Sequence, residues 1–388
     1  MSQRIRIAYL LDSIDDPTRG TVNHVRRLTH TLDRHEFFPH VLVMNDHVED
    51  QRLQGFTCRV ERLGYQVGKP WAIVRARLRL QRYLREHRCD VVCAYDRMAR
   101  IAGLPIVRSV HDGLCIGVAR DMGQDLNPDD LLRLRRSNEH VHRFVASSAA
   151  VANRLMRQEK VFRDWIDIIP EATLLDDGPL RTEESYVEAR HSFGFSIYEP
   201  VVLVYGAFAP WTDRTMLFEA LELLVEHHAN LRFVMMGRGS WDTIASVRAE
   251  AEQRALERQI VIADDPQLFD RWILAANVGI TASLYEGATD VLLRFMAIGL
   301  PVVATSSGDN TEIVSHGQTG YLVPPREADA LAMRIHLLLV ANDLERDFIA
   351  AARASVNNEF SDALEARRFS DYFRSLVYSQ VQGFERIA

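Results

Sequence analysis

The sequence predicts an α/β protein of two doubly wound, parallel-sheet domains that face a central cleft. Short, continuous apolar runs recur along the 388 residues, and segments with helical periodicity separate them. Continuous rather than alternating apolar runs are typical of strands buried on both faces of a parallel sheet. Helices between such strands form βαβ units. Ligands of these sheets bind at the carboxyl ends of the strands, so the cleft is the expected site.

Six apolar runs in the first half of the chain and five in the second half are the predicted strands. In the first half they cover residues 5–11, 41–44, 91–94, 106–110, 144–146 and 166–169. In the second half they cover residues 201–205, 233–236, 260–262, 278–281 and 302–304. Residues 21–32 and 216–227 place apolar side chains three and four positions apart, which is the periodicity of a helix with one buried face.

The domain boundary is predicted where this alternation stops. Residues 176–199 begin with an acidic Gly-Pro turn sequence and contain a further acidic stretch, so we interpret them as the linker with one lead-in helix. The first domain is then residues 1–175 and the second is residues 176–360. Residues 361–388 begin with a last predicted helix.

The composition is that of a globular protein and excludes two other classes. Hydrophobic residues make up 47% of the chain and charged residues 26%, which is enough apolar surface to form a core in each domain. The net charge of -7 argues against a nucleic-acid-binding polycation, so we expect no nucleic acid partner. No apolar run approaches the roughly 18 residues of a membrane-spanning helix.

Cysteine usage and the first residues indicate a cytoplasmic protein. The four cysteines are Cys58, Cys89, Cys93 and Cys115. They do not form paired Cys-x-x-Cys motifs, so we expect free thiols in a reducing compartment rather than a zinc site. Residues 1–11 contain a short apolar run that ends before Asp12 and lack the small-residue cleavage site of a signal peptide.

Residues 283–305 carry the most specific motif of the chain. Their sequence predicts a loop, a helix, a tight turn and a buried strand. It resembles the donor-site signature of the family 4 glycosyltransferases, Glu-Gly-x-Pro-x-x-x-x-Glu-Ala-Met-Ala-x-Gly-x-Pro-Val-Val-Ala-Thr. Glu286 matches the first acid of that signature, whereas Arg294 stands at the position of the second acid.

Further segments resemble the same family, in the family's order along the chain. They are residues 17–25, 88–92, 110–112, 169–171, 204–207, 236–239 and 317–325. The resemblance implies the GT-B fold, in which two Rossmann-like domains face each other. It also implies that residues 361–388 pack back on the first domain.

By resemblance, the protein transfers a sugar from a nucleotide-diphosphate donor to a hydroxyl of a glycan or lipid-linked acceptor, with retention of configuration. Glu286 would hold the sugar, because a carboxylate accepts several hydroxyl hydrogen bonds; its alternative role is a helix-start acid that the helix dipole favours. His111, predicted to close the strand at 106–110, would lie at the reaction centre and relay protons. A structural histidine is the alternative.

Backbone groups are predicted to line the rest of the donor site. N–H groups at a helix start bind phosphate without side chains. The residues that precede or begin the predicted helix are Gly287, Ala288, Thr289, Asp290 and Val291. Asp290 has the alternative role of a helix-capping acid.

The glycine turns and the first loop contribute further backbone groups by resemblance. The residues are Gly20, Thr21, Gly206 and Gly237.

The charged positions of the donor site depart from the family pattern. The family's diphosphate-binding Arg and Lys correspond to Ala207 and to Thr212 or Asp213, and Arg214 is the nearest substitute. Two lost phosphate contacts, at roughly 1.5–3 kcal/mol each, would weaken donor binding by about 100- to 10,000-fold. Arg294 has only hydrogen-bond donors and cannot replace an acid that accepts ribose hydroxyls.

Arg294 therefore has two alternative roles. It binds phosphate, or it forms an internal salt bridge, for which Glu286 and Asp290 are the expected partners.

A basic helix suggests contact with a membrane surface. Six arginines lie between Arg75 and Arg88 among apolar residues, and such a helix can bind anionic lipid at the inner membrane face. A solvated arginine-rich face is the alternative.

The sequence contains neither an Asp-x-Asp motif nor a phosphate-binding P-loop. We therefore expect no metal and no cofactor other than the nucleotide sugar as co-substrate.

Two other functions fit the same sequence. The donor-site changes are also those expected of a GT-B relative that has lost catalysis and acts as a binding or partner subunit. Another GT-B chemistry, such as epimerisation of a nucleotide sugar, is the third interpretation.

Overall fold

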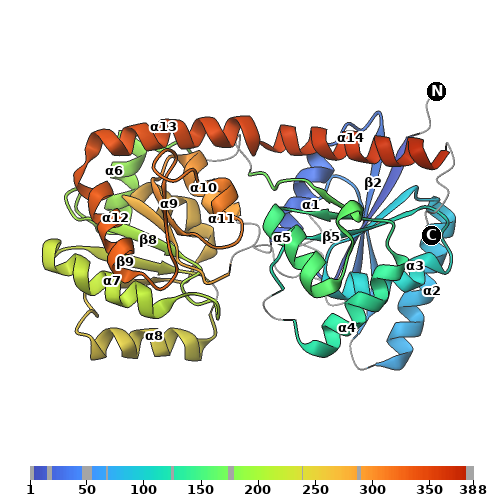
Figure 1. Ribbon diagram of the computed structural model, residues 1–388, viewed down its shortest axis with the longest axis horizontal. Coiled ribbons are helices and arrows are strands. Elements are labelled where there is room, and N and C mark those ends of the chain that lie inside the picture. Colours follow the sequence, from blue (N-terminus) through green and yellow to red (C-terminus); the bar gives the residue numbers. More distant parts are fainter. Residues whose placement is uncertain are drawn as a thin grey trace. The chain divides into compact units, whose positions relative to one another are not determined.

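The computed structural model divides the chain into two compact units (Figure 1). The first unit is Met1–Glu171 together with Asp362–Ala388, and the second unit is Ala172–Ser361. The residues described are 4–14, 20–45, 55–66, 69–123, 126–173, 179–237, 239–285 and 290–381. Each unit is an α/β domain around one parallel sheet.

The first unit contains a seven-stranded sheet in the order β3-β2-β1-β4-β5-β6-β7, and the pairing is parallel throughout. The strands are β1 (Ile5–Leu11), β2 (Phe37–Asn45), β3 (Arg59–Tyr65), β4 (Val91–Ala94), β5 (Leu114–Ala119), β6 (Arg143–Ala146) and β7 (Ile166–Ile168). The strand order reverses between β1 and β4, which is the doubly wound arrangement the sequence predicts.

Helices cover both faces of this sheet (Figure 1). They are α1 (Gly20–Thr31), α2 (Pro70–His87), α3 (Leu104–Arg108), α4 (Pro128–Ser137), α5 (Ala149–Arg154) and α14 (Asp362–Val381). Successive side chains of β1 alternate between two apolar cores, as the pleat of a strand requires. Tyr9 lies in the core with Phe369 and Phe373 of α14, and Leu10 lies in the core with Leu80 of α2.

The predicted strand at residues 106–110 is wrong. These residues belong to α3 and the turn after it, and β5, which the sequence analysis missed, pairs with β4 in the sheet. Pro105 lies in the first turn of α3, which continues directly from the π-helical turn Ala99–Gly103. Both segments are short apolar runs, and periodicity alone does not separate a buried strand from a buried helical turn.

The second unit contains a six-stranded parallel sheet in the order β10-β9-β8-β11-β12-β13. The strands are β8 (Val201–Tyr205), β9 (Arg232–Met236), β10 (Ile260–Ala263), β11 (Val278–Thr281), β12 (Val302–Thr305) and β13 (Tyr321–Val323). The helices are α6 (Glu183–Ser192), α7 (Arg214–His227), α8 (Trp241–Gln253), α9 (Phe269–Ala275), α10 (Asp290–Ile298), α11 (Asn310–Ile313), α12 (Ala328–Val340) and α13 (Asn342–Glu359).

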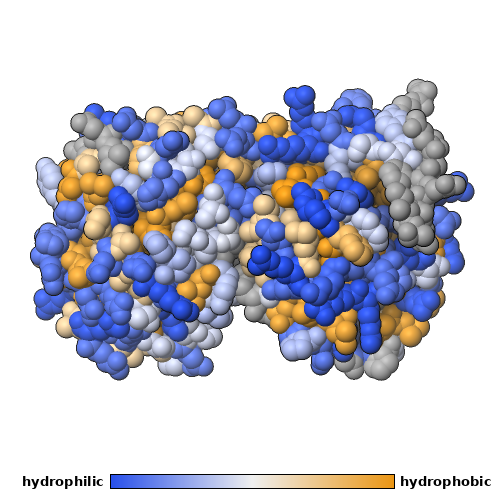
Figure 2. Space-filling view, in the orientation of Figure 1, coloured by the Kyte–Doolittle hydropathy of each residue, from blue (hydrophilic) through white to orange (hydrophobic). Residues whose placement is uncertain are grey.

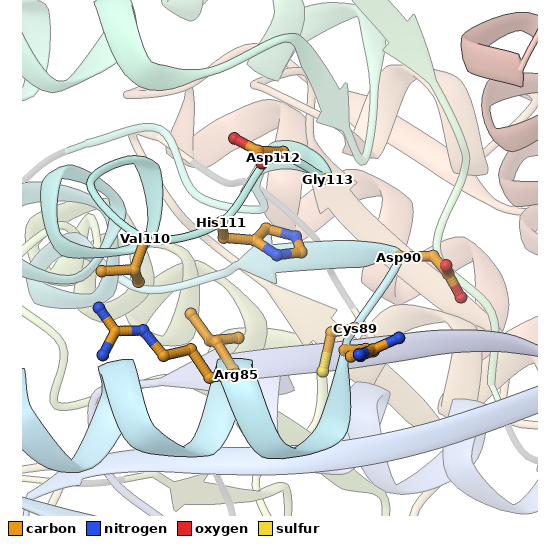
Figure 3. A pocket seen from close by; sticks show the side chains of 9 residues that line it. Arg85, Cys89, Asp90, Val110, His111, Asp112 and Gly113 are labelled. Atoms are coloured by element: carbon orange, nitrogen blue, oxygen red, sulfur yellow. The ribbon is translucent and has the colours of Figure 1, made fainter.

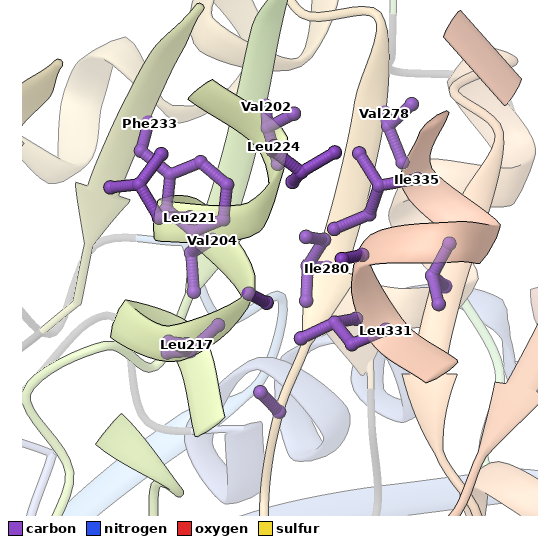
Figure 4. Packing of buried hydrophobic residues seen from close by; sticks show 14 of the residues in the cluster. Val202, Val204, Leu217, Leu221, Leu224, Phe233, Val278, Ile280, Leu331 and Ile335 are labelled. Atoms are coloured by element: carbon purple, nitrogen blue, oxygen red, sulfur yellow. The ribbon is translucent and has the colours of Figure 1, made fainter. Parts of the chain in front are cut away.

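The core on one face of this sheet explains why the apolar runs are continuous. Val202 and Val204 of β8 point into the same cluster as Leu221 of α7 and Ile335 of α12 (Figure 4). Leu203, between them in sequence, belongs to the core on the opposite face. Residues 201–204 of β8 are therefore all apolar, because both faces of the strand are buried.

Most of the predicted linker is built into the second unit. Helix α6 packs on α9, and the fully buried side chain of Arg190 donates to the carbonyl oxygens of Ala275 and Ser196, 2.9 and 2.7 Å away. Thr173 pairs with Ser361, so the chain enters and leaves the second unit at neighbouring points. Residues 174–178 lie outside the described part of the chain.

A buried charged cluster holds α14 in the first unit. The Glu365 carboxylate lies 3.1 Å from His24 Nδ1 and 3.4 Å from Arg27 Nη2, both of α1. Arg27 also lies 3.8 Å from Glu171, which pairs with Arg120. All five side chains are buried, so each charge depends on its partners for compensation.

The histidine of this cluster makes the stability of the first unit depend on pH. Burial lowers the pKa of His24 to about 4, although the charge of Glu365 opposes the shift. The unfolded chain therefore binds a proton that the folded unit excludes between about pH 6.5 and 4. The free energy of unfolding should therefore decrease as the pH is lowered through this window, by at most about 1.4 kcal/mol per pH unit for each such group.

We predict that His24→Gln flattens this pH dependence. Chemical denaturation from pH 7 to pH 4, with the transitions of the two units followed separately, measures the slope. His40, whose pKa burial also lowers to about 4, leaves a residual slope. His30→Gln, at an exposed histidine of the same helix, is the control and should keep the wild-type slope. Equal slopes in His24→Gln and the wild type would contradict the prediction.

Candidate functional site: the carboxyl edge of the second sheet

Two glycine turns form the floor of the candidate site. Gly206 follows β8 and Gly237 follows β9, and both have positive φ, +77° and +144°. A Cβ on Gly237 would lie 3.1 Å from the Cα of Gly206, and the φ of +144° is one that residues with a Cβ rarely adopt, so both the spacing and the backbone conformation favour glycine. The turns place glycine main chain at the carboxyl ends of neighbouring strands, and a Cβ on Gly206 would meet no atom within 4 Å.

The segment after Gly206 is fixed to the rest of this edge by hydrogen bonds. Asp213 N donates to Ala282 O at 2.9 Å, and Leu284 N donates to Trp211 O at 2.9 Å. The Asp213 carboxylate caps α7 by accepting from Met216 N at 3.3 Å, and it also accepts from Arg326 N at 3.0 Å. Asp213 therefore has a structural role at the position where the family pattern has a lysine.

Arg214 begins α7 directly after this cap. Its Nη1 is buried and has no hydrogen-bond partner among the described residues. An unsatisfied guanidinium N–H is costly in a folded protein, and such a group is available to an oxygen of a bound ligand.

Arg294 forms an ion pair, which was one of its two predicted roles. Its partner among the described residues is Asp270, whereas the expected partner Glu286 lies outside them, so that pairing stays a prediction. Its Nε lies 3.1 Å from Asp270 Oδ1 and its Nη2 lies 2.7 Å from Asp270 Oδ2. Two parallel N–H···O bonds of this kind form a bidentate pair, which is a strong arrangement of an arginine and a carboxylate. The pair joins α10 to α9.

The start of α10 is described only from Asp290 onward. Asp290 is its first residue and Val291, which is buried, its second. Glu286, Gly287, Ala288 and Thr289 lie outside the described residues, so their predicted roles stay predictions.

Helix α1 begins at the other predicted backbone donors, Gly20 and Thr21, and it belongs to the first unit.

His111 does not close a strand. It lies between α3 and β5, at the amino edge of the first sheet, beside Asp90, which precedes β4 (Figure 3). The pocket there has a volume of about 390 Å³, and Arg85, Asp112 and Gly113 also line it. Ligands of such sheets bind at the opposite edge, so the position of His111 does not support its predicted place at the reaction centre.

The environment of His111 is that of a buried neutral imidazole. Burial lowers its pKa, and the charges of Asp112 and Asp90 oppose the shift. Its Nε2 has no hydrogen-bond partner among the described residues.

The residues at the carboxyl edge of the first sheet were not among the predicted site residues. Arg120 follows β5 and pairs with Glu171, while Tyr95 follows β4 and its hydroxyl lies 3.1 Å from His24 Nε2. The apolar run at residues 114–119 was the available signal, since it identifies β5 and hence Arg120 as the residue at its end.

Comparison with known proteins identifies the family. The sequence profile of Glycosyltransferase Family 4 matches residues 18–173, and that of Glycosyl transferases group 1 matches residues 199–341. The chain therefore belongs to the group 1, or family 4, glycosyltransferases.

Solved structures agree on the GT-B fold. The crystal structure of HepE from Anabaena in complex with UDP and glucose gives a TM-score of 0.83 at 17% identity, covering 96% of this chain and 100% of HepE. A glycosyltransferase from Rickettsia africae gives 0.81 at 18% identity, covering 96% and 99%. At this identity the likeness establishes the fold alone.

Curated relatives match over parts of their length. The Vi polysaccharide biosynthesis protein VipC/TviE of Salmonella typhi is 31% identical over 99 residues, which are 26% of this chain and 17% of that protein. The D-inositol 3-phosphate glycosyltransferase of Pseudarthrobacter chlorophenolicus is 27% identical over 260 residues, 62% of this chain and 60% of that protein. Both matches span less than two thirds of the relative.

We predict that Gly237→Ala destabilises the second unit more than a matched substitution in an open turn. Gly317→Ala is the match, because Gly317 has φ +75° and a methyl group added there would meet no atom within 4 Å, so it carries only backbone strain of about 1–3 kcal/mol. At Gly237 the contact with Gly206 adds to that strain. Thermal unfolding of both variants measures the difference, and equal losses would contradict the close approach of the two turns.

Proposed function

We propose that this protein transfers a sugar from a nucleotide-diphosphate donor to a hydroxyl of a glycan or lipid-linked acceptor, with retention of configuration. The observation that carries the proposal is the unsatisfied Nη1 of Arg214, at the same sheet edge as the Gly206 and Gly237 turns. A phosphate oxygen satisfies such a donor, and glycine turns let a phosphate approach the main chain.

The relatives support this class of reaction. HepE was crystallised with UDP and with UDP-glucose. The relatives from Salmonella typhi and Pseudarthrobacter chlorophenolicus carry names that refer to polysaccharide biosynthesis and to glycosyl transfer. A nucleotide sugar is therefore the donor class that we carry over to this chain, and a saccharide or lipid-linked hydroxyl is the acceptor class.

In this proposal Arg214 supplies a positive charge that the family pattern places at another position. Ala207 provides no charge, Asp213 is committed to capping α7, and Arg294 pairs with Asp270. The N-terminus of α10, with its helix dipole, adds a favourable field for the diphosphate. Because these groups supply the positive potential, we propose that transfer needs neither a metal ion nor a further cofactor.

A binding or partner subunit without transferase activity is the second candidate. The observation that favours it is the commitment of Arg294 to Asp270 together with the uncharged Ala207, which leaves Arg214 as the substitute that we identify for the family's phosphate-binding side chains.

We also propose that α2 docks on an anionic membrane surface, which would place the protein at the inner membrane face. Trp71, Val74 and Leu78 are 55%, 58% and 60% exposed and lie three and four positions apart, so they form one row. Hydrophobic and hydrophilic residues are interspersed on the surface over α2 and α4 (Figure 2). The Arg75 guanidinium lies 4.9 Å from the Trp71 ring centroid.

The charge of α2 suits anionic lipid. From Pro70 to Arg88 the helix and its cap contain six arginines and a single acid, Glu86. An apolar row flanked by arginines is the pattern of a helix that lies in a membrane interface. No described helix is long and apolar enough to cross the membrane.

We predict that Arg214→Ala weakens nucleoside diphosphate binding by roughly 10- to 100-fold, the worth of one charge-assisted phosphate contact. Titration calorimetry with UDP, GDP and ADP measures it. Arg254→Ala is the control, because Arg254 forms an exposed pair with Glu222 at 3.1 Å in the same unit. Unchanged affinity in Arg214→Ala would contradict its role, and no binding by the wild type would favour the subunit function.

We predict that the double variant Trp71→Ala, Leu78→Ala lowers binding to phosphatidylglycerol vesicles by at least about tenfold, because two apolar anchors are lost. Vesicle co-sedimentation measures it, and binding by the wild type should weaken with added salt. Trp241→Ala removes an 81% exposed tryptophan of the second unit and serves as the control. Equal sedimentation of the double variant and the wild type would contradict docking through α2.

A further inference from the structure

We propose that Asp270 supplies the carboxylate that accepts the ribose hydroxyls of the bound nucleotide. This inference rests on the proposed function and adds a specificity-determining residue to it. Arg294 holds Asp270 in place from the neighbouring helix, so the two residues act as a unit.

The exposure of the pair favours the carboxylate as the member that contacts a ligand. The side chain of Asp270 is 36% exposed, whereas that of Arg294 is 16% exposed. The guanidinium is thus the covered member and the carboxylate the outward one. Each carboxylate oxygen has two acceptor sites, so the bidentate bond to Arg294 leaves acceptor capacity for two further hydroxyls.

Aromatic contacts link the start of α9 to the glycine floor. Its neighbour Phe269 packs on Tyr205, with ring centroids 5.0 Å apart, and Tyr205 is the last residue of β8, directly before Gly206. Phe269 also contacts Phe295 of α10 at 6.0 Å, which fixes α9 against the helix that carries Arg294. Asp270 therefore lies in the first turn of α9, at the sheet edge of the candidate site.

The chemistry of the ligand requires an acceptor here. Vicinal hydroxyls of a ribose donate hydrogen bonds, and Arg294 has only donors, so Arg294 alone cannot bind them. A carboxylate that an arginine orients can accept both hydroxyls, and bonds to a charged acceptor are roughly twice as strong as neutral ones. The pair thus moves the acid from α10 to α9 and keeps an acceptor at this edge.

A purely structural ion pair is the competing explanation. A pair of this exposure contributes at most about 1 kcal/mol to stability by joining two helices. A pair that only joins the two helices would not change the relative affinity for a ribose and for a sugar without hydroxyls. Discrimination is therefore the property to measure.

The test compares each nucleoside diphosphate with its 2′,3′-dideoxy form. UDP, GDP and ADP are titrated into the full chain, and the tightest is repeated as the dideoxy analogue. We expect the wild type to prefer the ribose form by about tenfold or more, since at least one charge-assisted hydrogen bond is lost in the analogue. Asp270→Asn should reduce this preference to less than about threefold, because a neutral amide accepts more weakly than a carboxylate.

Two further variants separate the alternatives. Glu222→Gln breaks the exposed pair with Arg254 in the same unit and should keep the wild-type preference. The exchange Asp270→Arg with Arg294→Glu preserves the ion pair, and so the fold, while it returns the acid to α10; it should retain the ribose preference.

The outcomes are distinguishable. Binding with an unchanged ribose preference in Asp270→Asn would overturn the role of Asp270 and leave the proposed function intact. The same preference lost equally in Glu222→Gln would show a general effect of breaking ion pairs and would also overturn it. Absence of binding by any of the three nucleoside diphosphates to the wild type would overturn the proposed function, and the inference with it.

Discussion

The buried carboxylate of Glu365 is the constraint on which the first unit depends. It lies among His24 and Arg27 of α1, and the same cluster continues through Glu171 to Arg120 at the end of β5. A carboxylate without these partners would cost several kcal/mol inside the protein, so α14 is held where α1 and the sheet supply them. The cluster thereby makes residues from opposite ends of the chain parts of one folding unit, and it orders the carboxyl edge of the first sheet.

The polar residues at the carboxyl edges of the two sheets differ in their exposure. At the first sheet, Arg120 and Glu171 pair with each other below the surface. At the second sheet, the space beside Gly206 is open, Arg214 Nη1 has no hydrogen-bond partner among the described residues, and Asp270 stays partly exposed. A ligand that brings phosphates and hydroxyls finds its complementary groups at the second edge, and this difference is why we locate donor binding there.

The features that the sequence predicted correctly are those that the pattern of apolar residues determines. Both doubly wound sheets follow from the continuous apolar runs, whereas the edge strands β3 and β13 were missed; in β3, charged residues interrupt the apolar run. The exchange of a strand at 106–110 for β5 misplaced His111, since two apolar runs of similar length stand close together. The pairing of Arg294 with Asp270 could not be predicted, because Asp270 lies 24 residues away on another helix and only packing brings the two together.

The number of phosphate contacts that are lost decides whether the donor site still binds its ligand. If Arg214 replaces one of the two basic residues of the family pattern and Asp270 replaces the acid, the net loss is a single phosphate contact. One such contact is worth roughly 10- to 100-fold in affinity, far less than the loss that the sequence changes alone imply. A transferase tolerates that loss when its donor is abundant, because turnover depends on contacts made in the transition state rather than on tight binding of the ground state. The substitutions are therefore compatible with a working enzyme of weaker donor affinity, and the motif alone does not identify a dead one.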